Sequence, residues 1–130
     1  MYRINLSETR EADWTITATD PEHGKVKIKI RYLLLDRDQI AERILGGLGD
    51  DSESDVGRFE ALRRTLSREE MERRDIELAE RIVDWDLGNE AGEKLPCTMP
   101  NKLAVLKIPF LFEPIDKGLF DASRGGQRKN

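Results

Sequence analysis

The chain has 130 residues and a mildly acidic charge balance. Lys and Arg total 22 against 26 for Asp and Glu, and this shortage of cations argues against a dedicated nucleic-acid-binding protein. No apolar run approaches the roughly 18 residues that a membrane-spanning helix needs. The N-terminal residues lack the apolar centre of a secretory signal, and the single cysteine, Cys97, cannot form an internal disulfide. We therefore expect a protein of a reducing cytoplasm.

Two stretches near the N-terminus alternate between apolar and polar residues. The second is the more regular: Val26, Ile28, Ile30 and Tyr32 alternate with Lys25, Lys27, Lys29 and Arg31. The first runs from Trp14 to Ala18, and a turn sequence with Pro21 and Gly24 separates the two. This period of two predicts an antiparallel hairpin at 13–32. Ile4 and Leu6 have the spacing of a short third strand.

From about residue 37 onward, the spacing of apolar residues is helical. Asp36 followed by Gln39 predicts a capped helix start, and the Gly-rich, acidic stretch 46–55 predicts a flexible linker. A short helix around Leu62 and a long, highly charged helix at 67–84 follow. The Thr98–Pro100 stretch begins another helix.

The final apolar segment starts at Pro109, and Pro114 predicts a kink or a restart within it. Residues 124–130 are expected to form a disordered basic tail. A hairpin alone is marginally stable, so its apolar face needs a cover. The sequence therefore predicts an α+β fold in one domain, 1–123, with the hairpin packed on a mainly helical C-terminal part of four or five helices.

Residues that carry catalysis or bind metals do not cluster in the sequence. His23 is the only histidine, which excludes a histidine-based zinc site within one chain. The acidic residues of the linker lack the Gly and Glu positions of a calcium-binding loop. Cys97 has no histidine near it in the sequence to activate its thiol. We expect no catalytic residue, no metal and no cofactor.

The cations of the second strand form a row on one side of it, namely Lys25, Lys27, Lys29 and Arg31. An anion-binding or nucleic-acid-binding surface would use such a row, which makes a small nucleic-acid-associated regulator the alternative function. No aromatic residues interleave with the cations to stack on bases. The commoner role of such lysines is solvation and the protection of a sheet edge, and this interpretation is favoured.

The C-terminal segment has more apolar residues than one helix face can bury. Phe110, Leu111 and Phe112 are contiguous, so they point in different directions from a helix axis. Together with Ile115, Leu119 and Phe120, they are either buried on all sides or form a surface for a partner and for weak self-association. Both interpretations remain open.

An ordered set of motifs occupies the stretch from Trp85 to Phe120. It comprises Trp85, a turn with Gly92, Leu95-Pro96-x-Thr98, Pro100-Asn101-x-Leu103, Leu106 and Pro109, followed by an apolar helix. This order resembles the tail assembly chaperones of bacteriophages with long, non-contractile tails. Two departures are that Cys97 stands where an aromatic residue is expected, and that Pro114 and Gly118 interrupt the last helix.

The resemblance implies a non-enzymatic protein of the bacterial host cytoplasm, encoded by a phage or prophage and absent from the mature virion. Such chaperones bind the tape measure protein, keep it soluble and promote polymerisation of the tail tube. The major tail protein is a second candidate partner, and a minor structural tail protein is a further alternative. In this family Lys129-Asn130 would suit a frameshift site that extends the chain; an ordinary polar terminus is the other interpretation.

Overall fold

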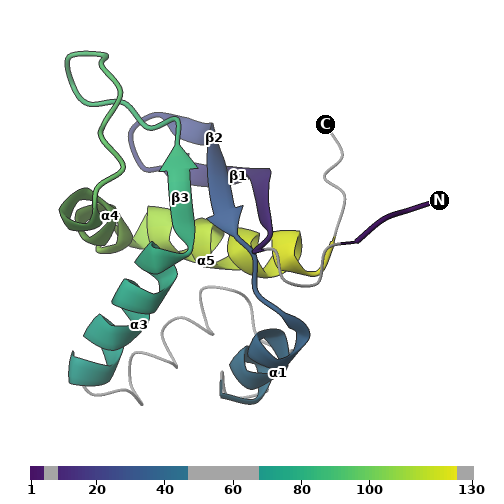
Figure 1. The fold of residues 1–130 in the computed structure, drawn as a ribbon. Helices are drawn as coiled ribbons and strands as arrows, with labels where there is room; N and C mark the ends of the chain where they lie inside the picture. The colour runs from purple at the N-terminus through teal and green to yellow at the C-terminus, as the bar shows by residue number, and fades with distance from the viewer. Residues whose placement is uncertain (5–8, 47–67, 126–130) are drawn as a thin grey trace.

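The computed structural model describes residues 1–4, 9–46 and 68–125 (Figure 1). Along the chain lie β1 (Glu11–Asp20), β2 (Gly24–Leu33), α1 (Arg37–Gly46), α3 (Arg68–Glu80), β3 (Ile82–Trp85), α4 (Met99–Leu106) and α5 (Pro109–Ser123). The predicted α+β fold is confirmed: the described part contains a three-stranded antiparallel sheet and four helices. Most of the predicted linker, the helix around Leu62 and the end of the tail lie outside the described residues.

The predicted hairpin is confirmed, and its second strand is the centre of the sheet. The strand order is β1-β2-β3, and β1 pairs with β2 from Glu11 opposite Leu33 to Asp20 opposite Gly24. Gly24 adopts a φ of 74°, which favours glycine, at the end of the turn. Strand β3 pairs with β2 only from Ile30 to Tyr32, so the expected edge protection does not apply to Arg31. Beside Lys25 and Lys27, no described strand lies on that side of β2, and for these two exposed lysines the interpretation stays a prediction.

The third strand comes from Ile82–Trp85 and not from the N-terminus, where Ile4 is exposed and outside any strand. The predicted helix at 67–84 is therefore too long, since α3 ends at Glu80. The Leu33 N–H donates to the Arg81 carbonyl at 2.7 Å, and the chain then pairs with β2. Pairing buries Ile82 and Trp85, whose β-branched and aromatic side chains favour a strand.

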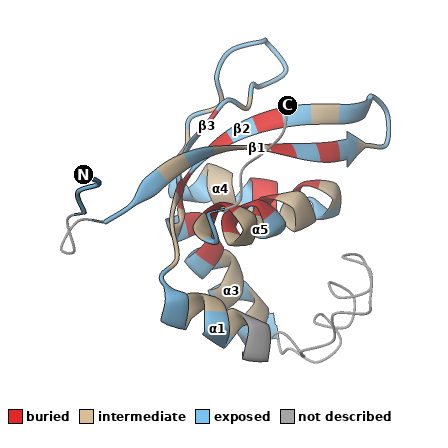
Figure 2. Cartoon of the chain, turned by 90° about the vertical axis from the view of Figure 1, so that its right-hand side faces the viewer, coloured by how far each residue is buried: buried red, intermediate tan, exposed pale blue. Residues whose placement is uncertain are grey.

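Helix α5 covers the apolar face of the sheet, mainly beneath β1 (Figures 1 and 2). The burial pattern alternates along β1 and β2, so one sheet face is apolar and packed while the other is polar and exposed. The core joins residues of the sheet to residues of the helices: Ile16, Ala18, Ile28, Ile30, Tyr32, Ile82 and Trp85 with Leu78, Ala79, Val105, Leu106, Leu111, Ile115, Leu119 and Ala122.

The predicted helix starts are confirmed by their capping bonds. The Gln39 N–H donates to Asp36 Oδ1 at 2.8 Å, and the Asp36 N–H donates to Gln39 Oε1 at 2.9 Å, which is a capping box. Thr98 caps α4 by accepting from the Asn101 N–H.

The last helix, α5, does not restart at Pro114 but continues through it. Proline has no backbone N–H to donate within the helix. The helix nevertheless continues, because apolar residues before and after Pro114, Leu111 and Ile115, are buried.

The distance between α5 and the sheet is set at Gly118. A Cβ atom at this position would lie 2.6 Å from Ile16 Cγ2 and 2.6 Å from the Tyr32 hydroxyl oxygen. The Tyr32 hydroxyl donates to the Ile115 carbonyl at 2.7 Å, so its buried polar atom is satisfied. Burial raises the pKa of Tyr32, which keeps the hydroxyl protonated as the donor. Gly118 therefore permits a contact that no larger residue would allow.

We expect Gly118→Ala to lower the free energy of unfolding by about 1–3 kcal/mol, the usual cost of overpacking a core. Urea unfolding followed by circular dichroism measures the effect. Removing the Tyr32 hydroxyl relieves one of the two close contacts, so Gly118→Ala combined with Tyr32→Phe should cost less than the sum of the single changes. Wild-type stability of Gly118→Ala would contradict this account.

Candidate functional site

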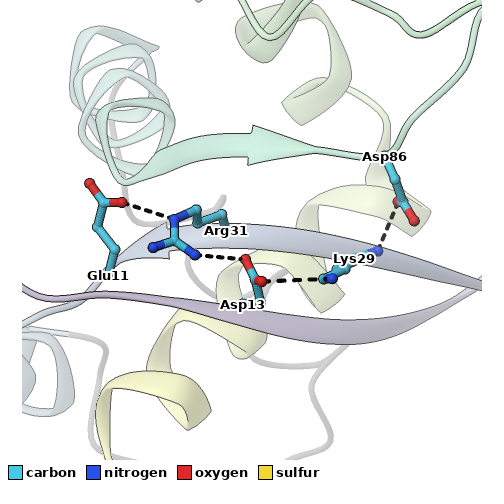
Figure 3. A network of polar contacts seen from close by, with 5 residues as sticks. All are labelled: Glu11, Asp13, Lys29, Arg31 and Asp86. Carbon is cyan, nitrogen blue, oxygen red and sulfur yellow. Dashed lines mark hydrogen bonds and ion pairs between the residues drawn. The ribbon is translucent and has the colours of Figure 1, made fainter.

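The polar face of the sheet carries the basic row, and the structure pairs half of it with acidic residues of β1 (Figure 3). Arg31 Nε donates to Glu11 Oε1 at 2.9 Å, and Arg31 also donates to Asp13 Oδ1 at 3.2 Å. Lys29 Nζ lies 3.7 Å from Asp13 Oδ2. The hydrogen bonds to Glu11 and to Asp13 raise the pKa of the Arg31 guanidinium. Arg31 and Lys29 are therefore largely neutralised within the protein itself.

Acidic residues also border the other side of β2. The Lys29 N–H donates to Asp86 Oδ1 at 2.8 Å, and the Asp86 N–H donates to the Lys29 carbonyl at 3.1 Å (Figure 3). Asp84 lies opposite Arg31 in the register, and its carboxylate accepts from Lys94 Nζ at 2.8 Å. Four carboxylates thus surround one end of the basic row, and a phosphate would meet repulsion as well as attraction there.

The other end of the row keeps its charge. Lys25 and Lys27 are exposed and lie opposite Thr19 and Thr17 of β1. In the described part of the chain, no carboxylate forms an ion pair with either lysine. Two neighbouring cations are few for a nucleic-acid surface, which neutralises several phosphates at once. The acidic partners of the basic row were not predicted from the sequence. Counting residue pairs outward from the turn would have placed Asp13 opposite Arg31.

The C-terminal apolar segment divides between core and surface. Leu111, Ile115 and Leu119 are 8%, 0% and 1% exposed, so they belong to the core and cannot contact a partner while the protein is folded. The prediction that these three residues belong to a partner surface is wrong. They are spaced four residues apart, close to one helical turn, so all three point toward the sheet. Phe110, Phe112 and Phe120 are half-buried.

The three phenylalanines differ in how they are held. Phe110 and Phe112 pack against the core from its margin. Phe120 lies near the end of α5, with the Arg124 guanidinium 5.2 Å from the centroid of its ring. Phe120 is partly exposed and, unlike Phe110 and Phe112, is not among the residues packed against the core, so its change should disturb the fold least. The predicted partner surface therefore reduces to Phe110, Phe112 and Phe120.

The motifs from Trp85 to Pro109 form one hydrogen-bonded connection between β3 and α4. Trp85 Nε1 donates to the Leu95 carbonyl at 2.7 Å, and Asn101 Nδ2 donates to the Pro96 carbonyl at 2.9 Å. Thr98 caps the same helix, and Leu106 is buried beneath it. These residues hold the loop and set where α4 and α5 begin.

The residues considered for metal binding or catalysis stay apart. His23 is exposed beside Asp20, with Nδ1 3.2 Å from Oδ2. Cys97 is half-buried, and burial raises the pKa of its thiol, which disfavours the reactive thiolate. Among residues 1–4, 9–46 and 68–125, no three His, Cys, Asp or Glu side chains gather as metal ligands. In the same ranges, no helix is both long and apolar enough to cross a bilayer.

The Asp84–Lys94 pair gives the stability of the fold a predictable pH dependence. The hydrogen bond from Lys94, helped by the Trp85 N–H, lowers the pKa of Asp84. A carboxyl with a lowered folded-state pKa stabilises the protein above its unfolded value of about 3.9, and the contribution is lost as the pH falls through the folded value. Lys94→Met should therefore lower the urea midpoint at pH 7 but have little effect at pH 2. An equal loss at both pH values would contradict an electrostatic role.

No family model, curated protein or solved structure matches this chain. The case for a function therefore rests on the surfaces described above and on the order of motifs from Trp85 to Phe120.

Proposed function

We propose that the protein is a tail assembly chaperone of a bacteriophage with a long, non-contractile tail, and that it binds the tape measure protein. The observation that carries the proposal is the connection from Trp85 to Thr98. Residues that the resemblance singles out by sequence join in one set of hydrogen bonds, through Trp85 to Leu95 and Asn101 to Pro96. A motif that is specific to a family but carries no catalytic residues is expected to have a structural role, and these hydrogen bonds supply one.

The surface proposed for the client lies along α5. Phe110, Phe112 and Phe120 are half-buried, and Ile108, just before the helix, is 37% exposed. An amphipathic helix of the client would cover such apolar positions, since helices dock through side chains spaced three and four residues apart. The contact that each chaperone copy makes is small, so many copies bound along a long client would be needed to keep it soluble. The charged outer face of the sheet would keep the coated client in solution.

A nucleic-acid-associated regulator is not favoured by these contacts. The alternative depended on a row of four cations, and Arg31 and Lys29 are paired with Glu11 and Asp13. The major tail protein stays a second candidate partner of the chaperone, since tube subunits polymerise around the client.

Charge at Phe120 should abolish the chaperone effect without unfolding the protein. Co-expression with the tape measure protein should raise the soluble fraction of that client, as measured by centrifugation of lysates. We expect Phe120→Asp to weaken client binding about tenfold to a hundredfold, which corresponds to the ~1.5–3 kcal/mol that a buried Phe contributes. Phe120→Leu, which keeps an apolar side chain, is the matched control.

Leu119→Ala distinguishes an effect on the core from an effect on the proposed client surface. Leu119 is 1% exposed, so its truncation should cost about 2–5 kcal/mol of stability. A folded Phe120→Asp variant that solubilises the client as well as wild type would overturn the proposed surface.

Weak self-association is proposed for the same residues, and Phe120→Asp should then reduce the concentration-dependent rise in sedimentation coefficient. A wild-type protein that stays monomeric at high concentration would exclude self-association.

A further inference from the structure

One flank of α5 carries a row of three half-buried residues that are spaced about one helical turn apart, Phe112, Asp116 and Phe120. Phe110 points to the other side of the helix, because two residues turn a helix through about 200°. Asp116 therefore lies between the two phenylalanines that share a flank. A client that covers these phenylalanines also covers the carboxylate between them.

The chain that leads into α1 and forms it touches this flank at two points. The Leu35 N–H donates to Ser123 Oγ at 2.9 Å, and Arg43 forms an ion pair with Asp116, whose side chains are 30% and 34% exposed. Along α5, these two contacts lie on either side of Phe120. In both views, α1 lies on the side of α5 that faces away from the sheet (Figures 1 and 2). The stretch 35–43 therefore spans the part of α5 that holds Phe120.

One face of α1 is turned toward the protein. Gln39, Ile40 and Arg43 are half-buried and share a face, since residues three and four apart lie together on a helix. The other described positions of the helix are exposed, namely Arg37, Asp38, Ala41 and Glu42. Of residues 37–43, none is buried and none belongs to the described core. This face of α1 therefore packs on the surface of the protein without entering its core.

The N-terminal cap of α1 is internal to the helix, whereas the residues just before it are bonded to the body of the protein. The Leu34 carbonyl accepts from Arg81 Nη1 at 3.1 Å, and the Leu35 N–H is held as described above. The two capping bonds between Asp36 and Gln39 would move together with the helix. At this end, α1 can therefore rotate about the Leu35–Asp36 junction without losing its cap.

The inward face of α1 has the chemistry of a ligand for this row of α5. Ile40 is apolar, and Arg43, three residues later, supplies the cation for Asp116. A client helix with an apolar residue and a cation at the same spacing would offer the row the same two groups. A client helix without the cation would cover the Asp116 carboxylate and leave it with no opposite charge, which weakens binding.

We propose that α1 is an autoinhibitory cover of the client surface, and that a client helix displaces it by presenting its own Lys or Arg to Asp116. This inference rests on the proposed function, because it takes the phenylalanines of α5 as the client surface. In the free protein, Arg43 occupies the place that the client's cation takes in the complex. Clients are therefore selected as basic amphipathic helices and not as apolar segments of any charge.

Thiol labelling measures the release of α1 in the absence of a client. In a Cys97→Ser background, Ile40→Cys places a thiol on the inward face of α1, and Glu42→Cys places one on its exposed face. Arg43→Gln should speed alkylation of the Ile40→Cys variant about twofold to fivefold, the equilibrium shift that a partly exposed ion pair supports. Alkylation of the Glu42→Cys variant should not change. Arg37→Gln, at an exposed arginine of the same helix, should alter neither rate.

Surface plasmon resonance over the immobilised tape measure protein tests the displacement. Arg43→Gln should raise the affinity of the full chain by the same twofold to fivefold, because the cover competes less well. Asp116→Asn should speed labelling of the Ile40→Cys variant equally, yet bind the tape measure protein more weakly than Arg43→Gln does, because the client's cation loses its carboxylate. Equal affinities of these two variants would overturn the role of a client cation.

The labelling and binding results distinguish failure of the cover from failure of the client surface. If Arg43→Gln leaves labelling of the Ile40→Cys variant unchanged while Phe120→Asp abolishes client binding, the cover is wrong and the client surface stands. If labelling responds but Arg43→Gln does not raise the affinity of a chain that binds, the autoinhibition is wrong. If labelling responds and neither wild type nor variant binds the tape measure protein, the proposed function is wrong and the autoinhibition falls with it.

Discussion

At Gly118, α5 lies so close to the sheet that a single methyl group would be 2.6 Å from both Ile16 and the Tyr32 hydroxyl. This close packing lets the hydroxyl reach the Ile115 carbonyl and brings Leu119 into the core. Because the helix is held beneath β1, its other apolar residues, the three phenylalanines, are left at the margin of the core. The same position fixes which face of the sheet is covered.

On the uncovered face, polar contacts replace packing. Arg31 bridges Glu11 and Asp13 of β1, and Asp86, the residue after β3, accepts from the backbone N–H of Lys29, so charge-assisted bonds lie on both sides of β2 at one end of the sheet. Exposed ion pairs of this kind contribute little stability one by one, but they cancel the charge that would otherwise attract phosphate. In the described part of the chain, Lys25 and Lys27 at the other end of the row form no ion pair.

Much of the fold could be predicted from the sequence where a local rule decides the structure. The alternation from Lys25 to Tyr32 and the capping pair Asp36 and Gln39 are such cases, since each depends on neighbours in the chain. Ile82 and Val83 could not be placed, because a helical spacing continued into them, and only pairing with β2 ends the helix at Glu80. For the same reason, Leu111, Ile115 and Leu119 looked like surface candidates until the position of the sheet was known.

Residue-level hydrogen exchange of the protein tests most directly whether α5 anchors the sheet on one face and whether β1 is its edge, as it is among the described residues. The account predicts slow exchange for the amides of Trp14, Ile16 and Leu119, and fast exchange for the amides of Thr15 and Thr19, which alternate with the first two along β1. Equal protection of Thr15, Trp14 and Ile16 would mean that the outer edge is covered, and it would contradict the account.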